Sequence, residues 1–253
     1  MCIVPPLMKK RYLFIGLLAL FLVGGIGFFL LEFPDTSLLK THYPVIFTKG
    51  FQKPKVFFVK NRPLHWVSLN DVSEKTLGAV LVSEDWAFYH HKGLDPNQIK
   101  KAFEINWQKG RFVRGASTIT QQVVRNVFLT KDKNLWRKFK EIILALRLEK
   151  ELSKNKILEI YLNIAEWGNG LYGIGAASQY YFSKYPHELT AREGAFLAVL
   201  LPSPQKYSRT FKEQGITEFA FNRIDDILQK MTQAQYLTPE EYEVELTEPL
   251  TLN

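Results

Sequence analysis

Residues 71–95 read DVSEKTLGAVLVSEDWAFYHHKGLD, and this stretch decides the fold that we expect. Its first half, residues 71–84, predicts a helix capped by Asp71. The apolar residues that this helix turns toward a core are Val72, Leu77, Val80 and Leu81. The helix ends in adjacent acids, Glu84 and Asp85, and a carboxyl group there is partly desolvated, which raises its pKa and suits it to acid–base chemistry. A solvated helix end followed by a loop is the alternative.

A second polar stretch lies at residues 114–126, RGASTITQQVVRN. Gly115 permits a tight turn, and Ser117 is a good N-cap for a following helix. The free amides and hydroxyls at the start of that helix, with Arg125 one to two turns later, suit a phosphate or a sugar. An ordinary capped helix explains the same residues equally well.

Residues 137–149, RKFKEIILALRLE, combine an apolar stripe with a charged one. The stripe predicted to face the core consists of Phe139, Ile142, Ile143 and Leu146. Arg137 and Lys138 lie one turn before Glu141 on another face, so they can pair with its carboxylate. The alternative is a salt-bridged amphipathic helix with no part in chemistry.

Most of the remaining chain is also predicted to be helical. The other segments with a helical pattern are 96–108, 117–129, 134–152, 154–164, 171–182, 189–200, 216–235 and 238–244. Residues 32–66 carry scattered prolines and short strands, which is typical of a stalk or linker. With 46% hydrophobic and 23% charged residues the chain is not disordered, and we predict a mainly α domain.

Residues 12–31, YLFIGLLALFLVGGIGFFLL, contain no charge, and a helix of this length spans the roughly 30 Å hydrocarbon core of a bilayer. Lys9, Lys10 and Arg11 precede the segment. The apolar segment predicts a transmembrane signal-anchor. The basic residues before it predict its orientation, with residues 1–11 as a cytoplasmic tail and the residues after the anchor outside. A cleaved signal peptide is the alternative, but the apolar run exceeds the usual ~7–15 residues and no A-x-A-like site follows.

This orientation changes the meaning of the charge and of the single cysteine. Cys2 falls on the cytoplasmic side, which excludes disulfides and cysteine-based zinc sites from the exported part. The chain has 33 basic and 25 acidic residues and a net charge of +8. Outside a membrane, anionic lipids and phosphate-bearing lipid substrates are the expected partners of such a domain, and nucleic acid is not.

Two further stretches complete a series of five. Residues 157–163 read ILEIYLN and lead through a glycine-rich link to the next helix, and residues 189–204 form an apolar helix with a proline stop. The earlier three fit E-D-x-x-F-x-x-H-x-G, G-x-S-T-I-T-Q-Q and R-K-x-x-E-x-x-x-A-x-x-x-E. Together, over about residues 66–209, the series resembles the peptidoglycan glycosyltransferases of the penicillin-binding-protein type.

The resemblance implies a lysozyme-like, two-lobed helical domain over residues 67–253, behind the anchor and the stalk. It implies the monofunctional member of the family, without a transpeptidase domain. The implied reaction polymerises lipid-linked disaccharide-peptide (lipid II) into β-1,4 glycan strands, with inversion and release of undecaprenyl diphosphate.

The resemblance also assigns roles to residues. Glu84 would be the general base. Glu141 would be the second carboxylate, on the donor side, where it holds a divalent cation (Mg or Mn) or orients the diphosphate. The residues that would bind or support the substrate are Asp85, Phe88, His91, Gly115, Ser117, Thr118, Gln121, Gln122, Arg125, Asn126, Arg137 and Lys138. No organic cofactor is implied.

The implied partners are lipid II, glycan-linked undecaprenyl diphosphate, membrane lipids and other cell-wall synthases. The implied location is the plasma (inner) membrane, crossed once, with the catalytic domain periplasmic. Residues 99–114 interleave basic and aromatic side chains, so we expect Trp107 and Phe112 to touch lipid. A plain amphipathic helix followed by a loop is the alternative.

Two other functions compete with polymerisation. A membrane-anchored, lysozyme-like lytic enzyme also uses a Glu in a helical cleft. The cations beside Glu141 argue against it, because a hydrolase needs no clamp for a diphosphate. An inactive scaffold for cell-wall synthases is the non-enzymatic alternative, and the presence of both carboxylates argues against it.

Overall fold

The structure is a computed structural model that describes residues 6–48, 54–111, 113, 115–130, 132 and 134–253. The chain divides into two compact units, one ending at Thr36 and one formed by Ser37–Asn253. The first unit contains helix α1 (Pro6–Glu32), which includes the predicted anchor. Within the described residues no helix combines the length and the apolar character that crossing a membrane requires.

Helix α2 (Glu74–Glu84) forms within residues 71–84, where the sequence predicts a helix. Its N-cap is Ser73, whose side chain accepts a hydrogen bond from the amide of Thr76, so the predicted Asp71 cap is wrong. Asp71 instead ends a short 3-10 helix, η2 (Leu69–Asp71). The helix buries Val80 and Leu81 as predicted and ends where Asp85 leaves the helical conformation.

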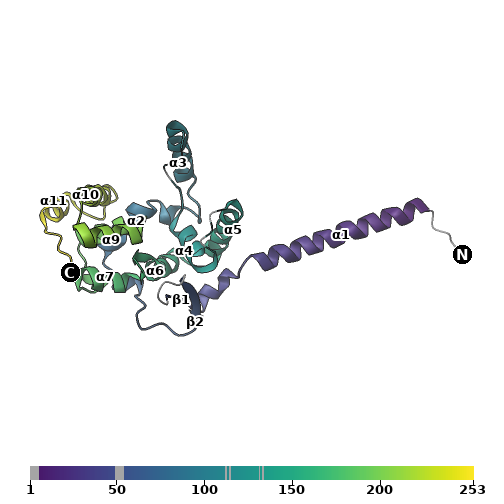
Figure 1. The fold of residues 1–253 in the computed structure, drawn as a ribbon, viewed down its shortest axis with the longest axis horizontal. Helices are drawn as coiled ribbons and strands as arrows, with labels where there is room; N and C mark the ends of the chain where they lie inside the picture. The colour runs from purple at the N-terminus through teal and green to yellow at the C-terminus, as the bar shows by residue number, and fades with distance from the viewer. Residues whose placement is uncertain (1–5, 49–53, 112, 114, 131, 133) are drawn as a thin grey trace. The chain divides into compact units, whose positions relative to one another are not determined.

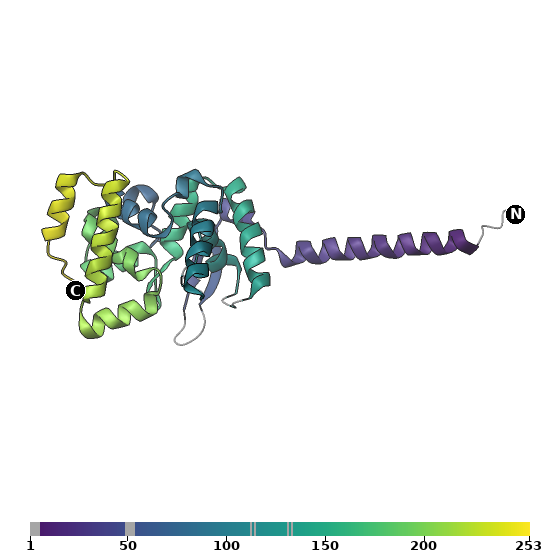
Figure 2. The same cartoon turned by 90° about the horizontal axis from the view of Figure 1, so that it is seen from above.

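The second unit contains two groups of packed helices. In one, α2 packs against α8 (Ala191–Leu200) and α10 (Glu218–Gln233), and α11 (Pro239–Thr247) lies against α10. In the other, α4 (Ile119–Phe128) packs against α5 (Leu135–Glu151) and α6 (Lys154–Ile164). Figures 1 and 2 show α10 and α11 at one end of this unit and α3 (Pro96–Lys109) and α5 toward the other. The fold is mainly helical, as predicted.

Helix α5 buries a different face from the one predicted. Its buried side chains are Glu141, Leu144, Ala145 and Leu148. Phe139 and Leu146, from the predicted core stripe, are 42% and 37% exposed, so that prediction is wrong. The charged cluster around Glu141 turns inward, and this rotation moves the apolar stripe toward the surface.

Residues 32–66 are predicted as a stalk or linker. From Ser37 onward this segment belongs to the same compact unit as the later helices. The 3-10 helix η1 (Thr36–Lys40) comes first. An antiparallel pair follows, β1 (Tyr43–Phe47) and β2 (Lys55–Val59), with Val45 opposite Phe57. The segment after β2 is bound to α6. There Trp66 donates its indole N–H to Glu159 at 2.9 Å, and Asn163 bonds both backbone groups of Val67 at 2.8 Å.

The remaining elements connect or cover these groups. They are η3 (Phe88–His90), β3 (Glu166–Gly168), β4 (Leu171–Tyr172), α7 (Ile174–Phe182), η4 (Pro186–Glu188) and α9 (Pro204–Gln214). Two differ from the sequence prediction. Residues 171–172 form a strand before α7 begins, and Pro204 starts a helix instead of only ending α8, because proline fits the first turn of a helix.

The close crossing of α2 and α8 yields a test of the packing. A Cβ on Gly194 would lie 2.8 Å from the Cα of Thr76, so Gly194→Ala must push the two backbones apart. We expect the free energy of unfolding to fall by about 1–3 kcal/mol, measured by urea denaturation. Gly175→Ala is the control, because its Cβ would meet a methyl group of Val67, which can move aside. Equal losses in the two variants would contradict this packing.

Candidate active site

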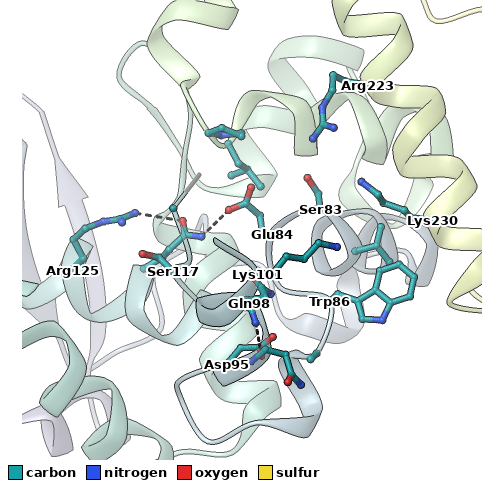
Figure 3. A pocket seen from close by; sticks show the side chains of 17 residues that line it. Ser83, Glu84, Trp86, Asp95, Gln98, Lys101, Ser117, Arg125, Arg223 and Lys230 are labelled. Atoms are coloured by element: carbon teal, nitrogen blue, oxygen red, sulfur yellow. Dashed lines mark hydrogen bonds between the residues drawn. The ribbon is translucent and has the colours of Figure 1, made fainter. Parts of the chain in front are cut away.

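Glu84, at the C-terminal end of α2, lines a cavity of about 780 Å³. Figure 3 shows its carboxylate in the middle of the site, with Ser117 and Arg125 of one wall on one side and Lys101 and Lys230 on the other. The lining residues are Val82, Ser83, Glu84, Trp86, Ala87, Asp95, Asn97, Gln98, Lys101, Gly115, Ser117, Gln122, Arg125, Leu201, Pro202, Arg223 and Lys230. They come from both helix groups, so the cavity opens where the groups meet.

The surroundings of Glu84 raise its pKa. Burial is the main cause, and the neighbouring charge of Asp85 adds to it. Three groups oppose the rise: Gln122, which donates its Nε2–H to Glu84 Oε2 at 2.7 Å, and the positive charges of Arg125 and Arg223. While it is ionised, a carboxylate with a raised pKa is a better proton acceptor than an ordinary Glu.

Asp85, next to Glu84, has the opposite placement. It is fully buried, and its carboxylate bonds His91 Nε2 at 2.9 Å and accepts the amide of Ile119, the first residue of α4, at 2.9 Å. The Gly93 amide donates to His91 Nδ1, which leaves the ring proton of the neutral imidazole on Nε2, facing Asp85. Phe88 is also buried, with its ring against that of His91. These residues join α2 to α4 beneath the cavity.

The start of α4 is capped by Thr118, so the predicted Ser117 cap is wrong. The Thr118 hydroxyl accepts the Gln121 amide, and the Gln121 side chain in turn accepts the Thr118 amide. This capping box occupies Thr118 and Gln121, both buried, whereas Ser117 lines the cavity. The second motif therefore divides into residues that build the helix end and residues that face the cavity.

Glu141 is 1% exposed and is paired with two cations, as the sequence predicted. Arg137 donates to its Oε2 at 2.6 Å, and Lys138 donates to Oε1. Lys138 also reaches Ser117 Oγ at 3.1 Å, which links this cluster to the wall of the cavity. Removing Arg137 or Lys138 would leave one oxygen of the buried Glu141 carboxylate without its cationic partner.

These contacts do not fit the divalent cation predicted for Glu141. Both carboxylate oxygens already have a cationic partner, and a metal ion would have to displace Arg137 and Lys138. Among the described residues there is also no group of three or more His, Cys, Asp or Glu side chains arranged to hold a metal.

The predicted site residues thus separate into two sets. Those that line the cavity are Glu84, Gly115, Ser117, Gln122 and Arg125. Those outside its lining are Asp85, Phe88, His91, Thr118, Gln121, Asn126, Arg137, Lys138 and Glu141. Arg114 and Phe112 lie outside the described residues. Trp107 of α3 is 78% exposed and stacks on Phe103, with 6.0 Å between the ring centroids.

Sequence reasoning missed the cations on the far wall. Arg223 and Lys230 of α10 and Lys101 of α3 line the cavity. Arg223 and Lys230 are seven residues apart, which places them on one face of α10. The spacing can be seen in the sequence, but no local pattern indicates that this face of α10 meets the end of α2. Asp226 pairs with Arg223 at 2.9 Å and with Lys230 at 3.5 Å, so it offsets part of this charge. The positive charge that remains on the walls around Glu84 suits a hydroxyl nucleophile and an anionic leaving group.

Comparison with known proteins decides the family. The family model described as Transglycosylase matches residues 53–232. The chain belongs to the transglycosylase family. It is 42% identical over 170 residues to a biosynthetic peptidoglycan transglycosylase of Paraburkholderia phytofirmans, covering 67% of this chain and 69% of that protein. A protein of the same name from Herminiimonas arsenicoxydans is 36% identical over 224 residues, covering 88% and 92%.

A longer relative also matches this chain. Penicillin-binding protein 1A of Aquifex aeolicus is 38% identical over 259 residues, which cover 97% of this chain but only 34% of that protein. The chain thus spans about a third of the length of that relative. The comparisons confirm the resemblance drawn from the five motifs and favour a biosynthetic peptidoglycan glycosyltransferase over the lytic alternative.

The buried joint beneath the site can be tested by Asp85→Ala. The change leaves the Ile119 amide and the His91 ring without their acceptor in the interior, so we expect unfolding free energy to fall by about 2–5 kcal/mol. The control is Asp71→Ala, whose side chain is 63% exposed and should change stability by no more than about 0.5 kcal/mol. Similar losses in chemical denaturation would show that Asp85 is not a structural joint.

Proposed function

We propose that this transglycosylase polymerises lipid II into β-1,4 glycan strands of peptidoglycan, with Glu84 as the general base. The observation that carries the proposal is a carboxylate of raised pKa at the meeting point of the two helix groups, surrounded by Arg125, Arg223, Lys101 and Lys230. Such a site offers a proton acceptor for a sugar hydroxyl and positive charge for a diphosphate.

In this reaction Glu84 accepts the proton of the C4 hydroxyl of the acceptor N-acetylglucosamine as its oxygen attacks the anomeric carbon of the donor. The new glycosidic bond forms while the bond from that carbon to the diphosphate oxygen breaks. The electron pair of the broken bond leaves with undecaprenyl diphosphate, and the configuration at the anomeric carbon inverts. Gln122 keeps the carboxylate oriented through its hydrogen bond to Oε2.

The cations around the cavity would stabilise the departing diphosphate. Arg125 presents a forked donor from α4. Arg223 and Lys230, which share Asp226 as an ion-pair partner, present charge from α10. Arg137 and Lys138 serve this purpose indirectly in our proposal. Glu141 offsets one of their two charges, and Lys138 fixes the Ser117 hydroxyl at the cavity wall.

We further propose that the enzyme works at the plasma (inner) membrane, with residues 12–31 as a single-pass anchor, the N-terminus cytoplasmic and the catalytic unit periplasmic. The support is the uncharged sequence of the segment and its apolar side chains, such as Phe21, which is 78% exposed. The exposed Phe103 and Trp107 of α3 would contact membrane lipids. Lipid II and the growing glycan are the proposed substrates, and other cell-wall synthases the proposed partners.

The decisive experiment compares wild type with Glu84→Gln in polymerisation of labelled lipid II. Loss of the base should lower kcat by about 10²–10⁴-fold. Glu74→Gln, an exposed residue at the other end of α2, is the matched control and should keep full activity. Normal polymerisation by Glu84→Gln would refute the base role. Cleavage of preformed glycan by the wild type, without polymer formation, would support the lytic alternative.

The pH dependence follows from the raised pKa of Glu84. The carboxylate acts as a base only when it is ionised, so kcat/KM should fall on the acid side of the pH profile (the acid limb). This fall should occur at a higher pH than it would for an ordinary Glu, whose pKa is about 4.3. Because the charge of Arg125 lowers the pKa of Glu84, Arg125→Gln should move this acid limb to still higher pH. A limb that stays in place or moves to lower pH in Arg125→Gln would contradict the assignment.

A further inference from the structure

Tyr161 of α6 is a fully buried side chain that reaches the active site from below. It belongs to the I-L-E-x-Y-L-N stretch, most of which serves as scaffold, and 1% of its surface is exposed. Its hydroxyl donates to Gln122 Oε1 at 3.4 Å, on the side of the amide away from Glu84. Burial raises the pKa of Tyr161 well above its usual value, so the hydroxyl keeps its proton and remains a donor.

The amide of Gln122 has two possible orientations, and its neighbours favour one. On one side lie two donors, the Tyr161 hydroxyl and the Arg125 guanidinium, the latter 3.5 Å from Oε1. On the other side lies the Glu84 carboxylate, which accepts Nε2–H at 2.7 Å. Turning the amide over would set its oxygen against the carboxylate and its NH₂ against the guanidinium, and both contacts are repulsive.

We propose that Tyr161 is a positioning residue, which holds the Gln122 amide oxygen so that its NH₂ group points at Glu84. The inference rests on the proposed function, because it gives a purpose to a residue behind the proposed base. Arg125 alone cannot fix the amide as firmly, since its guanidinium also faces the cavity where an anionic substrate would attract it. Tyr161 is enclosed by the protein and has no such competing partner in the substrate.

Other groups also act on Glu84, and the substitution of Tyr161 leaves them unchanged. They are Asp85 after α2, Arg125 of α4 and Arg223 of α10, with Lys101 and Lys230 lining the same cavity. Tyr161 is uncharged, so Tyr161→Phe removes one hydroxyl and no charge. A change in the titration of Glu84 would therefore come through the hydrogen bonds of Gln122.

The test measures the pKa of Glu84 directly and without substrate. The pKa is followed by NMR in protein whose glutamates carry 13C at Cδ. The signal of Glu84 is assigned as the one that is missing from the spectrum of Glu84→Gln. Tyr161→Phe should raise the pKa of Glu84, because the Gln122 hydrogen bond that lowers it becomes weaker. It should also lower kcat at neutral pH by about three- to tenfold, the effect of one hydrogen bond, and move the acid limb of kcat/KM to higher pH.

Tyr181→Phe is the matched control, because Tyr181 is another buried tyrosine whose hydroxyl donates to a backbone oxygen, that of Trp167, away from the cavity. It should leave the pKa of Glu84 and the acid limb unchanged. If Tyr161→Phe behaves like Tyr181→Phe, the proposal is wrong.

A second variant shows whether Tyr161 acts through Gln122. Gln122→Met keeps the length of the side chain and removes the amide, so adding Tyr161→Phe to it should not raise the pKa of Glu84 further. A further rise of the same size in the double variant would overturn the proposal, since Tyr161 would then act on Glu84 without Gln122. If the pKa moves as expected but the acid limb does not follow, the base role of Glu84 fails and the orientation of Gln122 stands.

Discussion

The buried carboxylate of Asp85 is the contact on which the site depends. It lies at the point where α2 ends, and it accepts hydrogen bonds from the imidazole of His91 and from the first amide of α4. A helix N-terminus carries unpaired amides and partial positive charge, so a carboxylate is a favourable partner for it. The bond fixes the end of α2 against the start of α4. As a result Glu84 lies within hydrogen-bonding distance of Gln122, one turn along α4.

The same joint explains how two adjacent carboxylates serve different purposes. Asp85 leaves the helical conformation, with φ −156° and ψ 73°, and its side chain turns into the interior. Glu84 is still helical and projects into the cavity. Asp85 has donors on both of its oxygens. Glu84 accepts a single hydrogen bond from the part of the chain that the structure describes, that of Gln122, and its carboxylate faces the cavity. The chain thus uses one acid for structure and leaves the other available for proton transfer.

Local signals explain which parts of this arrangement could be predicted from sequence. The end of α2, the pairing of Glu141 with Arg137 and Lys138, and the helix after Ser117 all depend on residues within one or two turns. The face of α5 that is buried could not be predicted from such local signals. The sequence predicts that its apolar stripe faces the core, but burying Glu141 with its partners turns the helix so that Phe139 is 42% exposed. The contribution of Arg223 and Lys230 depends on packing α10 against α2, a contact between residues about 140 positions apart, which no local pattern encodes.

Gly93 shows why the first three motifs form one unit in space. Its amide donates to His91 of the first motif, and its carbonyl accepts the hydroxyl of Thr118 from the second. Its φ of +88° suits glycine, and an added Cβ would lie 3.1 Å from the carbonyl oxygen of Ala145 in the third. A side chain at this position would therefore strain the loop and push it away from α5. Each motif is ordinary when read alone, because a capped helix or a salt-bridged helix explains it; their meaning comes from the close approach at Gly93, which requires all three at once.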